Sequence, residues 1–264
     1  MSISYWLDES LTSNNTKNYD YTIVGAGIAG LSTAYWLEKK SPHAKIAIID
    51  KFSLAYGASG RNAGFVTCGS ALHFNKLYEK FGQAKAQEIW QFSEMNRELL
   101  LKEIIQDEAN KVDYKTTGSC TVIPDESHLG KFEKILKTMK TLNIAVDMID
   151  AKTLQKEYAV KISAGAIEYK HDGIIHPVKL LKKIQSQLKN TDFIFGQEVF
   201  KIQSNETTAQ VTTQKQIYQS TQVFLCLNGF VSQLMPEFNE IIKPQRGQVI
   251  VTEPMPQMIK GPCY

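Results

Sequence analysis

The sequence predicts an α/β protein (α+β over the whole chain), in which a parallel βαβ domain with an antiparallel meander is interleaved with a second domain of mixed sheet and helices. Three observations predict it. Residues 21–50 contain a β-branched run, a glycine turn, a helical pattern and a second apolar run, which is the order of a βαβ unit. Short strand-like runs separated by polar turns follow at residues 193–218. A continuous apolar run at 223–227 predicts a late strand that rejoins the first sheet.

The glycine turn has the sequence GAGIAG and follows the expected strand at residues 21–24. Gly25 permits the sharp turn, Gly27 lets the backbone approach a pyrophosphate, and Gly30 lets the helix pack closely on the strand. The phosphates would lie at the positive end of the helix that starts near Ile28, where backbone N–H groups have no partner within the helix.

The second strand, residues 46–49, ends on Asp50, twenty positions after Gly30. A carboxylate at this place can accept hydrogen bonds from both hydroxyls of a ribose. Three small residues can also form a simple turn, but the two strands, the helix and the acid together predict a dinucleotide site. No arginine follows Asp50 closely enough to pair with a 2′-phosphate, which disfavours NADP. The motif alone does not separate NAD from FAD.

Composition indicates an ordinary globular protein. Hydrophobic residues make up 43% of the 264 residues and charged residues 22%. The net charge of +3 comes from dispersed lysines, so nucleic acid is not an expected partner. The cysteines are far apart and form no C-x-x-C pair, which argues against a disulfide framework or a metal site and favours a reducing compartment: Cys68, Cys120, Cys226 and Cys263. The uncharged stretch before Glu38 is too short for a bilayer span. We expect a cytoplasmic protein with no membrane span.

Residues 51–70 have no periodicity and are dense in small side chains, which predicts a loop that lets a flat group pass close to the backbone. A long helix is expected at 72–107, where apolar residues recur every three or four positions. The later elements are expected, in chain order, as strands around Gly118 (112–123), a helix (128–142), a strand (144–149), a helix (151–158), a strand (165–169), a helix from Pro177 to residue 188, the meander (193–195, 199–202, 209–213, 216–218), the late strand (223–227) and a final strand (246–252).

This order predicts two discontinuous domains. The nucleotide-binding domain is expected to comprise residues 19–82 and 165–235, and the second domain residues 83–164 and 236–264. Residues 1–18 are expected to form an N-terminal arm.

Six motifs occur in the order seen in the D-amino-acid oxidase superfamily of FAD-dependent amine oxidoreductases: GAGIAG, Asp50, GASGRNAG (57–64), DGIIHP (172–177), LNG (227–229) and PQRGQV (244–249). The pattern most resembles the γ-glutamylputrescine oxidase-like branch, including Ser4-Tyr5-Trp6 ahead of the nucleotide fold. The resemblance covers essentially the whole chain and implies a Rossmann-type FAD-binding domain with FAD as cofactor. Members of the family are longer, so the chain resembles an N-terminal portion whose substrate domain is incomplete.

The resemblance also implies a role for each matching position. The pyrophosphate would be held by Gly25, Gly27, Ile28 and Gly30, and the adenosine ribose by Asp50 and Lys51. Ala58 and Ser59 would contact the pyrophosphate and ribityl chain. The isoalloxazine would lie against Arg61, Asn62, Ala63 and Gly64. Val199 would bind the adenine through its backbone, and the cofactor would also be lined by Leu227, Asn228 and Gly229.

Some of these residues have simpler alternative roles. Arg61 could tie the loop together, and Asn62 could form a turn. His176, next to Pro177, fits a helix entry better than a catalytic base. Cys68 fits a small buried filler better than a point of covalent flavin attachment. We therefore assign no catalytic residue.

The reaction implied by the resemblance is hydride transfer to the flavin from the carbon next to an amine, after which the imine hydrolyses. The substrate would be a small amine or amino acid, γ-glutamylputrescine-like or a D-amino acid. A site that disfavours the ammonium form suffices without a dedicated base. A D-amino-acid dehydrogenase or sarcosine-type oxidase would use the same chemistry. A different alternative is a truncated or non-catalytic flavin-binding chain that needs a missing C-terminal segment, a complementing chain or a homo-oligomer, because a sheet edge would be unpaired.

Overall fold

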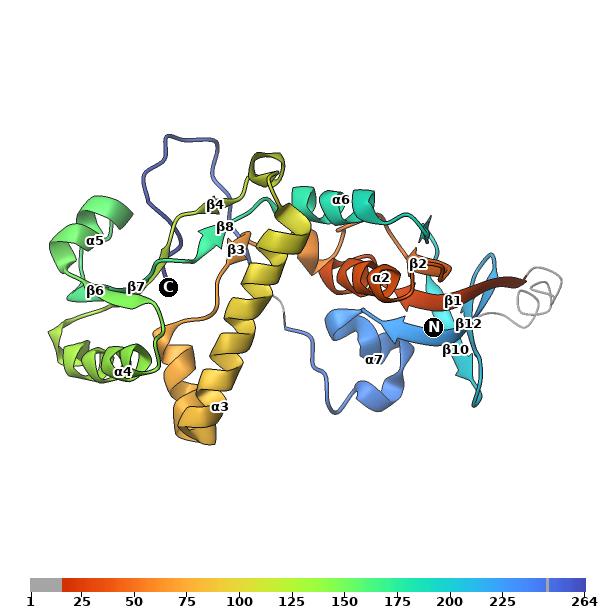
Figure 1. The fold of residues 1–264 in the computed structure, drawn as a ribbon, viewed down its shortest axis with the longest axis horizontal. Helices are drawn as coiled ribbons and strands as arrows, with labels where there is room; N and C mark the ends of the chain where they lie inside the picture. Colours follow the sequence, from red (N-terminus) through yellow and green to blue (C-terminus); the bar gives the residue numbers. More distant parts are fainter. Residues whose placement is uncertain (1–15, 246) are drawn as a thin grey trace. The chain divides into compact units, whose positions relative to one another are not determined.

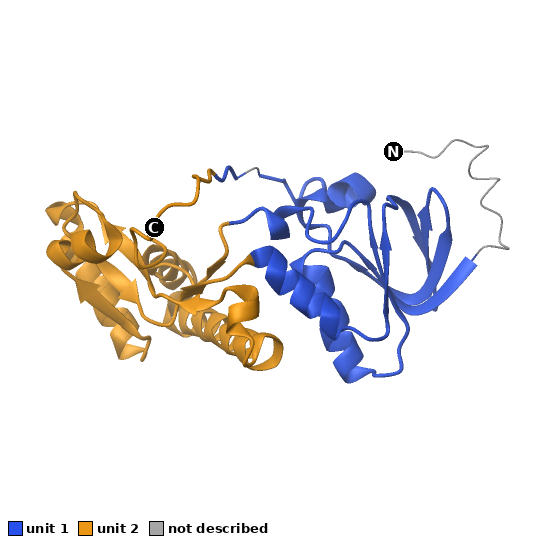
Figure 2. Ribbon diagram, turned by 90° about the horizontal axis from the view of Figure 1, so that it is seen from above, with its two compact units in different colours: residues 1–62, 177–249 blue, residues 63–176, 250–264 orange. Residues whose placement is uncertain are grey.

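The computed structural model describes residues 16–245 and 247–264 (Figure 1). The chain forms two compact units, each built from two separate segments (Figure 2). Of the described residues, those within 16–62 and 177–249 form unit 1, and those within 63–176 and 250–264 form unit 2. The units differ from the predicted domains, since residues 63–82 and 165–176 belong to unit 2 and 236–249 to unit 1. The predicted N-terminal arm, with Ser4-Tyr5-Trp6, lies outside the described residues except for its last three positions, 16–18.

Unit 1 is built on a six-stranded sheet with the order β10-β11-β12-β1-β2-β9. Four strands run parallel: β1 (Thr16–Val24), β2 (Ile46–Asp50), β9 (Thr191–Phe195) and β12 (Ile217–Leu225). The antiparallel part is β10 (Val199–Ser204) and β11 (Ala209–Thr213). Two helices pack together on this unit, α2 (Ile28–Lys40) and α6 (Pro177–Gln187) (Figure 1). The βαβ unit therefore forms as the glycine turn predicts.

The late strand rejoins the first sheet, which confirms that prediction. β12 pairs in parallel with β1 along its whole length, up to the pair Val24↔Leu225. The segments predicted as separate strands at 216–218 and 223–227 are one strand, whose first half also pairs with β11. The assignment of residues 193–195 to the meander is wrong, because β9 pairs in parallel with β2 at the sheet edge. A short apolar run does not reveal its partner strand.

Unit 2 is built around a three-stranded antiparallel sheet, β5-β7-β6. Its strands and helices are β5 (Ser119–Ile123), β6 (Val146–Ile149), β7 (Gly165–Tyr169), α3 (Ala71–Leu99), α4 (Leu129–Thr141) and α5 (Ala151–Tyr158). All five residues of β7 are buried. Ile167 and Tyr169 lie in a core with α3 and α4, and Ala166 packs against Leu154 and Tyr158 of α5. Helices therefore cover both faces of this sheet.

Shorter elements complete the fold. A second sheet in unit 2 has the order β3-β8-β4, with β3 (Phe65–Val66), β8 (Gly173–Ile174) and β4 (Lys115–Thr116). The short helical segments are η2 (Ala58–Gly60), η3 (Leu100–Ile105), η4 (Ala109–Val112), η5 (Glu126–His128), η6 (Asn228–Phe230), α7 (Val231–Leu234) and η7 (Pro236–Phe238). The helix predicted at 72–107 is interrupted at Gly82, whose φ is 80°, and continues beyond Leu99 as the π-type segment η3.

The final strand predicted at 246–252 is wrong for the residues that the structure describes. Residues 247–252 form no strand, and Val249, Ile250 and Val251 are 60%, 94% and 90% exposed. The alternating pattern is present in the sequence, but no neighbouring strand pairs with it among the described residues. Within 16–245 and 247–264, no helix is long and apolar enough to cross a bilayer.

Candidate functional site

At Gly25 and Gly30, the glycine turn of unit 1 leaves no room for a side chain. Gly25 has a φ of 112°, and a Cβ there would lie 2.4 Å from the carbonyl oxygen of Cys226. A Cβ on Gly30 would lie 1.9 Å from the carbonyl oxygen of Gly25. The turn is tied to the next strand, because the N–H of Gly25 donates to the carbonyl of Ile49 (2.8 Å). The backbone thus forms a tight cradle at the carboxyl end of β1.

Asp50 lies directly against this turn. Its Oδ2 accepts a hydrogen bond from the N–H of Ala26 (2.7 Å), and its Oδ1 accepts one from the N–H of Phe52 (2.8 Å). Each carboxylate oxygen can accept further hydrogen bonds. The carboxylate therefore keeps acceptor capacity beside the glycine turn, which fits the predicted contact with ribose hydroxyls.

The start of α2 suits an anion. Its first turn carries no acidic residue, and Gly27 supplies no side-chain cap. The N–H of Ile28 donates to Ser59 Oγ (2.9 Å), so the loop with η2 lies across the helix start. The Ser59 hydroxyl therefore accepts a hydrogen bond from an N–H group that could donate to a phosphate oxygen instead. The glycine cradle, the carboxylate and this donor set together fit a dinucleotide.

The remaining positions predicted for the adenosine half lie close by. The turn before β10 is bonded to the end of β2, since the N–H of Gln197 donates to the carbonyl of Asp50 (3.1 Å). Lys51 Nζ pairs with Glu198 Oε1 at 2.9 Å. Val199, the first residue of β10, follows Gln197 by two positions and packs in one apolar core with Ile49, the neighbour of Asp50.

The second predicted turn flanks the glycine turn. The N–H of Cys226 donates to the carbonyl of Val24 (2.8 Å), and Leu227, Asn228 and Gly229 follow directly. Asn228 has a φ of 52°, and a Cβ on Gly229 would lie 2.8 Å from Pro244 Cβ. The close packing at this turn explains a glycine at its last position.

The residues predicted to lie against the isoalloxazine make local contacts. The Arg61 guanidinium lies 4.6 Å from the centre of the Tyr56 ring. Asn62 Nδ2 donates to the carbonyls of Ala58 (3.1 Å) and Ser59 (2.9 Å). These contacts match the simpler alternative roles, in which Arg61 ties the loop together and Asn62 forms a turn. Ala63 and Gly64 begin unit 2. Contact of these four residues with a flavin ring stays a prediction.

Unit 2 contains a buried polar cluster that sequence reasoning missed. Asp172, the first residue of the DGIIHP motif, is 2% exposed, and its Oδ2 accepts a hydrogen bond from Ser119 Oγ (2.6 Å). Its Oδ1 lies 3.9 Å from an Arg97 guanidinium nitrogen, which donates to Cys68 Sγ (3.4 Å). Burial raises the pKa of the Cys68 thiol to about 11. A protonated, half-buried thiol supports the prediction of a filler.

We expect Asp172→Asn to become more stable relative to the natural chain as pH rises. Burial raises the pKa of the Asp172 carboxyl, outweighing the hydrogen bond from Ser119 and the charge of Arg97. The folded chain then binds this proton more tightly than the unfolded chain. Its unfolding free energy therefore falls as pH rises from the ordinary Asp pKa of about 3.9 through the higher folded value.

Urea unfolding of both chains, from acid to neutral pH, measures this difference. Asparagine does not titrate, so the contributions of all other titrating groups to the unfolding free energy cancel when the two chains are compared. If the advantage of Asp172→Asn shrank as pH rose, the Arg97 charge rather than burial would control the carboxylate.

The fold and the site of unit 1 define a dinucleotide-binding protein. Residues 20–263 match the profile of the family described as DAO, FAD dependent oxidoreductase. The chain belongs to this family of FAD-dependent oxidoreductases. FAD is the cofactor of the family, which confirms the predicted cofactor and resolves the choice between NAD and FAD that the motif left open.

Two curated relatives and one solved structure illustrate the similarity. The chain is 23% identical to gamma-glutamylputrescine oxidoreductase of Escherichia coli K12, over 92% of this chain and 57% of the relative. It is 30% identical to a mitochondrial L-2-hydroxyglutarate dehydrogenase of Caenorhabditis briggsae, over 52% of this chain and 29% of the relative. Glycine oxidase from Geobacillus kaustophilus superposes with a TM-score of 0.67 at 17% identity, over 83% of this chain and 58% of that chain. This superposition confirms the predicted fold class.

The chain is similar to an N-terminal portion of longer proteins. It spans 57% of the length of the E. coli relative, which accords with the expectation drawn from the motifs.

Proposed function

We propose that the chain is part or all of an FAD-dependent oxidoreductase that oxidises the C–N bond of a small amine or amino acid. The observation that carries the proposal is the Asp50 carboxylate, anchored by the N–H groups of Ala26 and Phe52 against the glycine turn. The family match over residues 20–263 supports the flavin. The similarity to gamma-glutamylputrescine oxidoreductase supports an amine substrate.

In this proposal each residue of the site has a physical task. Bound FAD supplies the hydride-accepting chemistry. The cradle of Gly25, Gly27 and Gly30 admits the pyrophosphate, and the start of α2 stabilises its charge. Asp50 orients the ribose through hydrogen bonds. The Ser59 hydroxyl, now bonded to Ile28, can donate to a phosphate oxygen once the pyrophosphate takes that N–H.

The substrate side follows from the chemistry of amines. Loss of a hydride and a proton converts the C–N bond to an imine, which water cleaves to a carbonyl product and ammonia or a smaller amine. The amine must be neutral for its lone pair to assist, so an apolar pocket that disfavours ammonium suffices. We also propose a cytoplasmic setting, supported by four cysteines that are all free thiols.

We expect the purified chain to acquire the visible absorption bands of bound flavin when FAD is added, and to keep them after desalting. Anaerobic addition of single amines and amino acids should then bleach these bands. Bleaching by an amine supports the proposal. Retained flavin that no substrate bleaches would favour the non-catalytic alternative, and failure to retain FAD would count against the proposed site in this chain.

A second candidate is oxidation of a C–O bond in a 2-hydroxy acid. It is supported by the 30% identity to an L-2-hydroxyglutarate dehydrogenase over about half of this chain. Including 2-hydroxy acids in the same bleaching panel separates the two candidates, since bleaching by these acids alone would overturn the amine assignment.

A further inference from the structure

The last described residues of the chain lie beside β5 as an extended segment. The N–H of Cys120 donates to the carbonyl of Pro262, and the N–H of Tyr264 donates to the carbonyl of Cys120, both at 2.9 Å. The N–H of Val122 donates to the carbonyl of Tyr264, also at 2.9 Å. In this parallel bridge Cys263 lies directly opposite Cys120. Opposite residues of neighbouring strands project their side chains from the same face of a sheet.

The two thiols meet on this face. Cys120 Sγ lies 3.3 Å from Cys263 Sγ and donates a hydrogen bond to it. Cys120 is fully buried and Cys263 partly buried, and both pack with Leu154 and Tyr158 of α5. Neighbouring strands lie about 4.8 Å apart, and disulfides join Cα atoms that lie about 4.4–6.8 Å apart. The two sulfur atoms therefore need to approach by only about 1.3 Å to reach the bonded length of about 2.0 Å.

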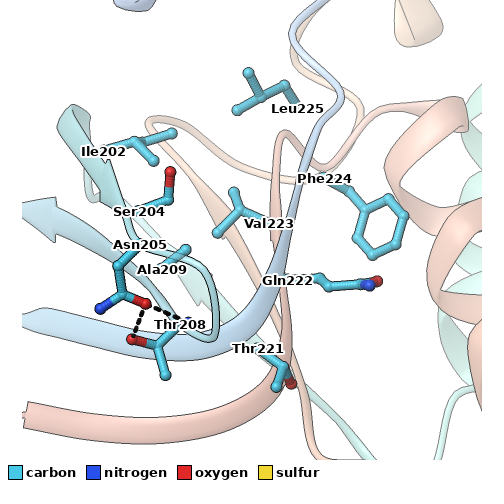
Figure 3. A pocket seen from close by; sticks show the side chains of 10 residues that line it. All are labelled: Ile202, Ser204, Asn205, Thr208, Ala209, Thr221, Gln222, Val223, Phe224 and Leu225. Carbon is cyan, nitrogen blue, oxygen red and sulfur yellow. Dashed lines mark hydrogen bonds between the residues drawn. The ribbon is translucent and has the colours of Figure 1, made fainter.

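The other two cysteines contact polar side chains instead. Cys68 Sγ accepts a hydrogen bond from the Arg97 guanidinium at 3.4 Å, and Cys226 Sγ lies 3.9 Å from a threonine hydroxyl. The hollow beside β12, with a volume of about 340 Å³, is lined by ten residues of unit 1, none of which is a cysteine (Figure 3). Of the four cysteines, all of which the structure describes, Cys120 and Cys263 are the pair placed to react with each other.

A bond between these thiols would hold the end of a long exposed segment. Residues 247–259 are exposed, whereas Gly261 is buried, and a Cβ there would lie 2.3 Å from the carbonyl oxygen that precedes β5. Lys260 Nζ pairs with Glu157 at 2.9 Å and with Glu168 at 2.6 Å. Because exposed ion pairs contribute little, the segment is held mainly by backbone hydrogen bonds and close packing, without a covalent tie.

We propose that Cys120 and Cys263 form a redox modification site, at which a low-molecular-weight disulfide converts the two thiols to a disulfide that fixes residues 260–264 to β5. Cys263 reacts first, because it is the more exposed thiol and accepts the hydrogen bond from Cys120. Its thiolate attacks one sulfur of the small disulfide, whose S–S bond breaks and releases a small thiolate. Cys120 Sγ then attacks Cys263 Sγ and passes its proton to the departing second small thiolate. The two protein thiols are thus oxidised, and the small disulfide is reduced to two thiols.

The environment of the pair sets how readily it reacts. Burial raises the pKa of both thiols above the ordinary value, and for Cys120 the hydrogen bond to Cys263 adds to this effect. Since the thiolate is the nucleophile, exchange is slow at neutral pH. The site therefore stays reduced in a reducing compartment and responds to a sustained rise in small disulfides.

Thiol mapping of the purified chain tests the site without flavin or activity. The reduced chain is incubated with oxidised glutathione at mildly alkaline pH, the remaining thiols are alkylated, and its peptides are analysed by mass spectrometry. We expect two of the four thiols to disappear, with Cys120 and Cys263 in one linked pair of peptides. Cys68 and Cys226 should remain open to alkylation. Glutathione that stays on Cys263, bonds to either of the other cysteines, or disulfide-linked dimers would each overturn the proposal.

Two further measurements test whether the bond fixes the segment. After oxidation, the amides of Cys120 and Tyr264 should exchange about tenfold more slowly, and the urea midpoint should rise, because the bond closes a long loop in the unfolded chain. Cys263→Ser should show neither change after the same treatment. Cys68→Ser removes another partly buried thiol of unit 2 and should respond like the natural chain. A Cys120–Cys263 bond that left the exchange of Tyr264 unchanged would contradict the fixing of the segment.

Discussion

Gly25→Ala is expected to abolish tight FAD binding. The new Cβ would lie 2.4 Å from the carbonyl oxygen of Cys226, and the residue would have to keep a φ of 112°. The atom it meets belongs to the backbone of β12, which is paired with β1 and cannot move alone. Such strain costs about 1–3 kcal/mol, and the clash adds to it. Since the same backbone forms the pyrophosphate cradle, we expect FAD affinity to fall by about a hundredfold or more, at about 1.4 kcal/mol per tenfold.

Gly57→Ala and Gly82→Ala are matched controls for this change. A Cβ on Gly57 meets nothing within 4 Å, and its φ of −78° suits alanine. Gly82 has a φ of 80° but open space around it, and lies in unit 2. Gly57→Ala should be neutral, and Gly82→Ala should lower stability while leaving flavin affinity intact. Absorbance titration with FAD and urea unfolding measure the two quantities. If Gly25→Ala bound FAD as well as Gly57→Ala does, the cradle would not hold the cofactor.

The parts of the fold that the sequence predicts well are those with local signals. The spacing of Gly25, Gly27 and Gly30, followed by a helical pattern and Asp50, fixes strand, turn and helix within thirty residues. The helix of α5 and the strand β7 agree with the predicted bounds, 151–158 and 165–169. In each case the residues themselves carry the conformational preference.

The predictions that fail concern which strands pair with one another. β9 looks like any short apolar strand, and only the chain's return through α6 places it beside β2. Thr16–Asn18 are polar and give no strand signal, yet they extend β1 because β12 runs beside them. Residues 247–252 alternate like a strand but have no partner among the described residues. Strand pairing depends on contacts distant in sequence, so a local pattern does not determine it.

The candidate functional residues likewise include some that motifs predict and others that only the structure brings together. The anchored carboxylate at Asp50 and the turn at 227–229 follow from motifs, and the structure brings them to one end of the sheet. The cluster of Asp172, Arg97 and Ser119 joins residues far apart in the chain, and no spacing rule connects them. The DGIIHP motif contains Asp172, but it does not predict the contacts of Asp172 with Arg97 and Ser119. Its contacts hold the segments of Cys68 and Ser119 together in unit 2.

Asp50→Ala should weaken FAD binding strongly while leaving the fold intact. The change removes the acceptor of two backbone N–H groups, including that of Ala26, which is 1% exposed. It also removes the proposed partner of the ribose hydroxyls. Hydrogen bonds to a charged group contribute about 1.5–3 kcal/mol, so we expect FAD affinity to fall by about tenfold to a hundredfold. Asp50→Asn keeps one oxygen acceptor, so its FAD affinity should lie between those of the natural chain and of Asp50→Ala.

Asp20→Ala separates the cofactor effect from a general loss of stability. Asp20 Oδ2 also accepts a hydrogen bond from a backbone N–H, that of Lys45, at 2.7 Å. This contact lies where β2 begins, whereas Asp50 lies where the same parallel strand ends. We expect Asp20→Ala to lower the unfolding free energy slightly and to leave FAD affinity unchanged. Equal losses of affinity in the two variants would mean that Asp50 acts only through the stability of the sheet, and its role at the ribose would have to be abandoned.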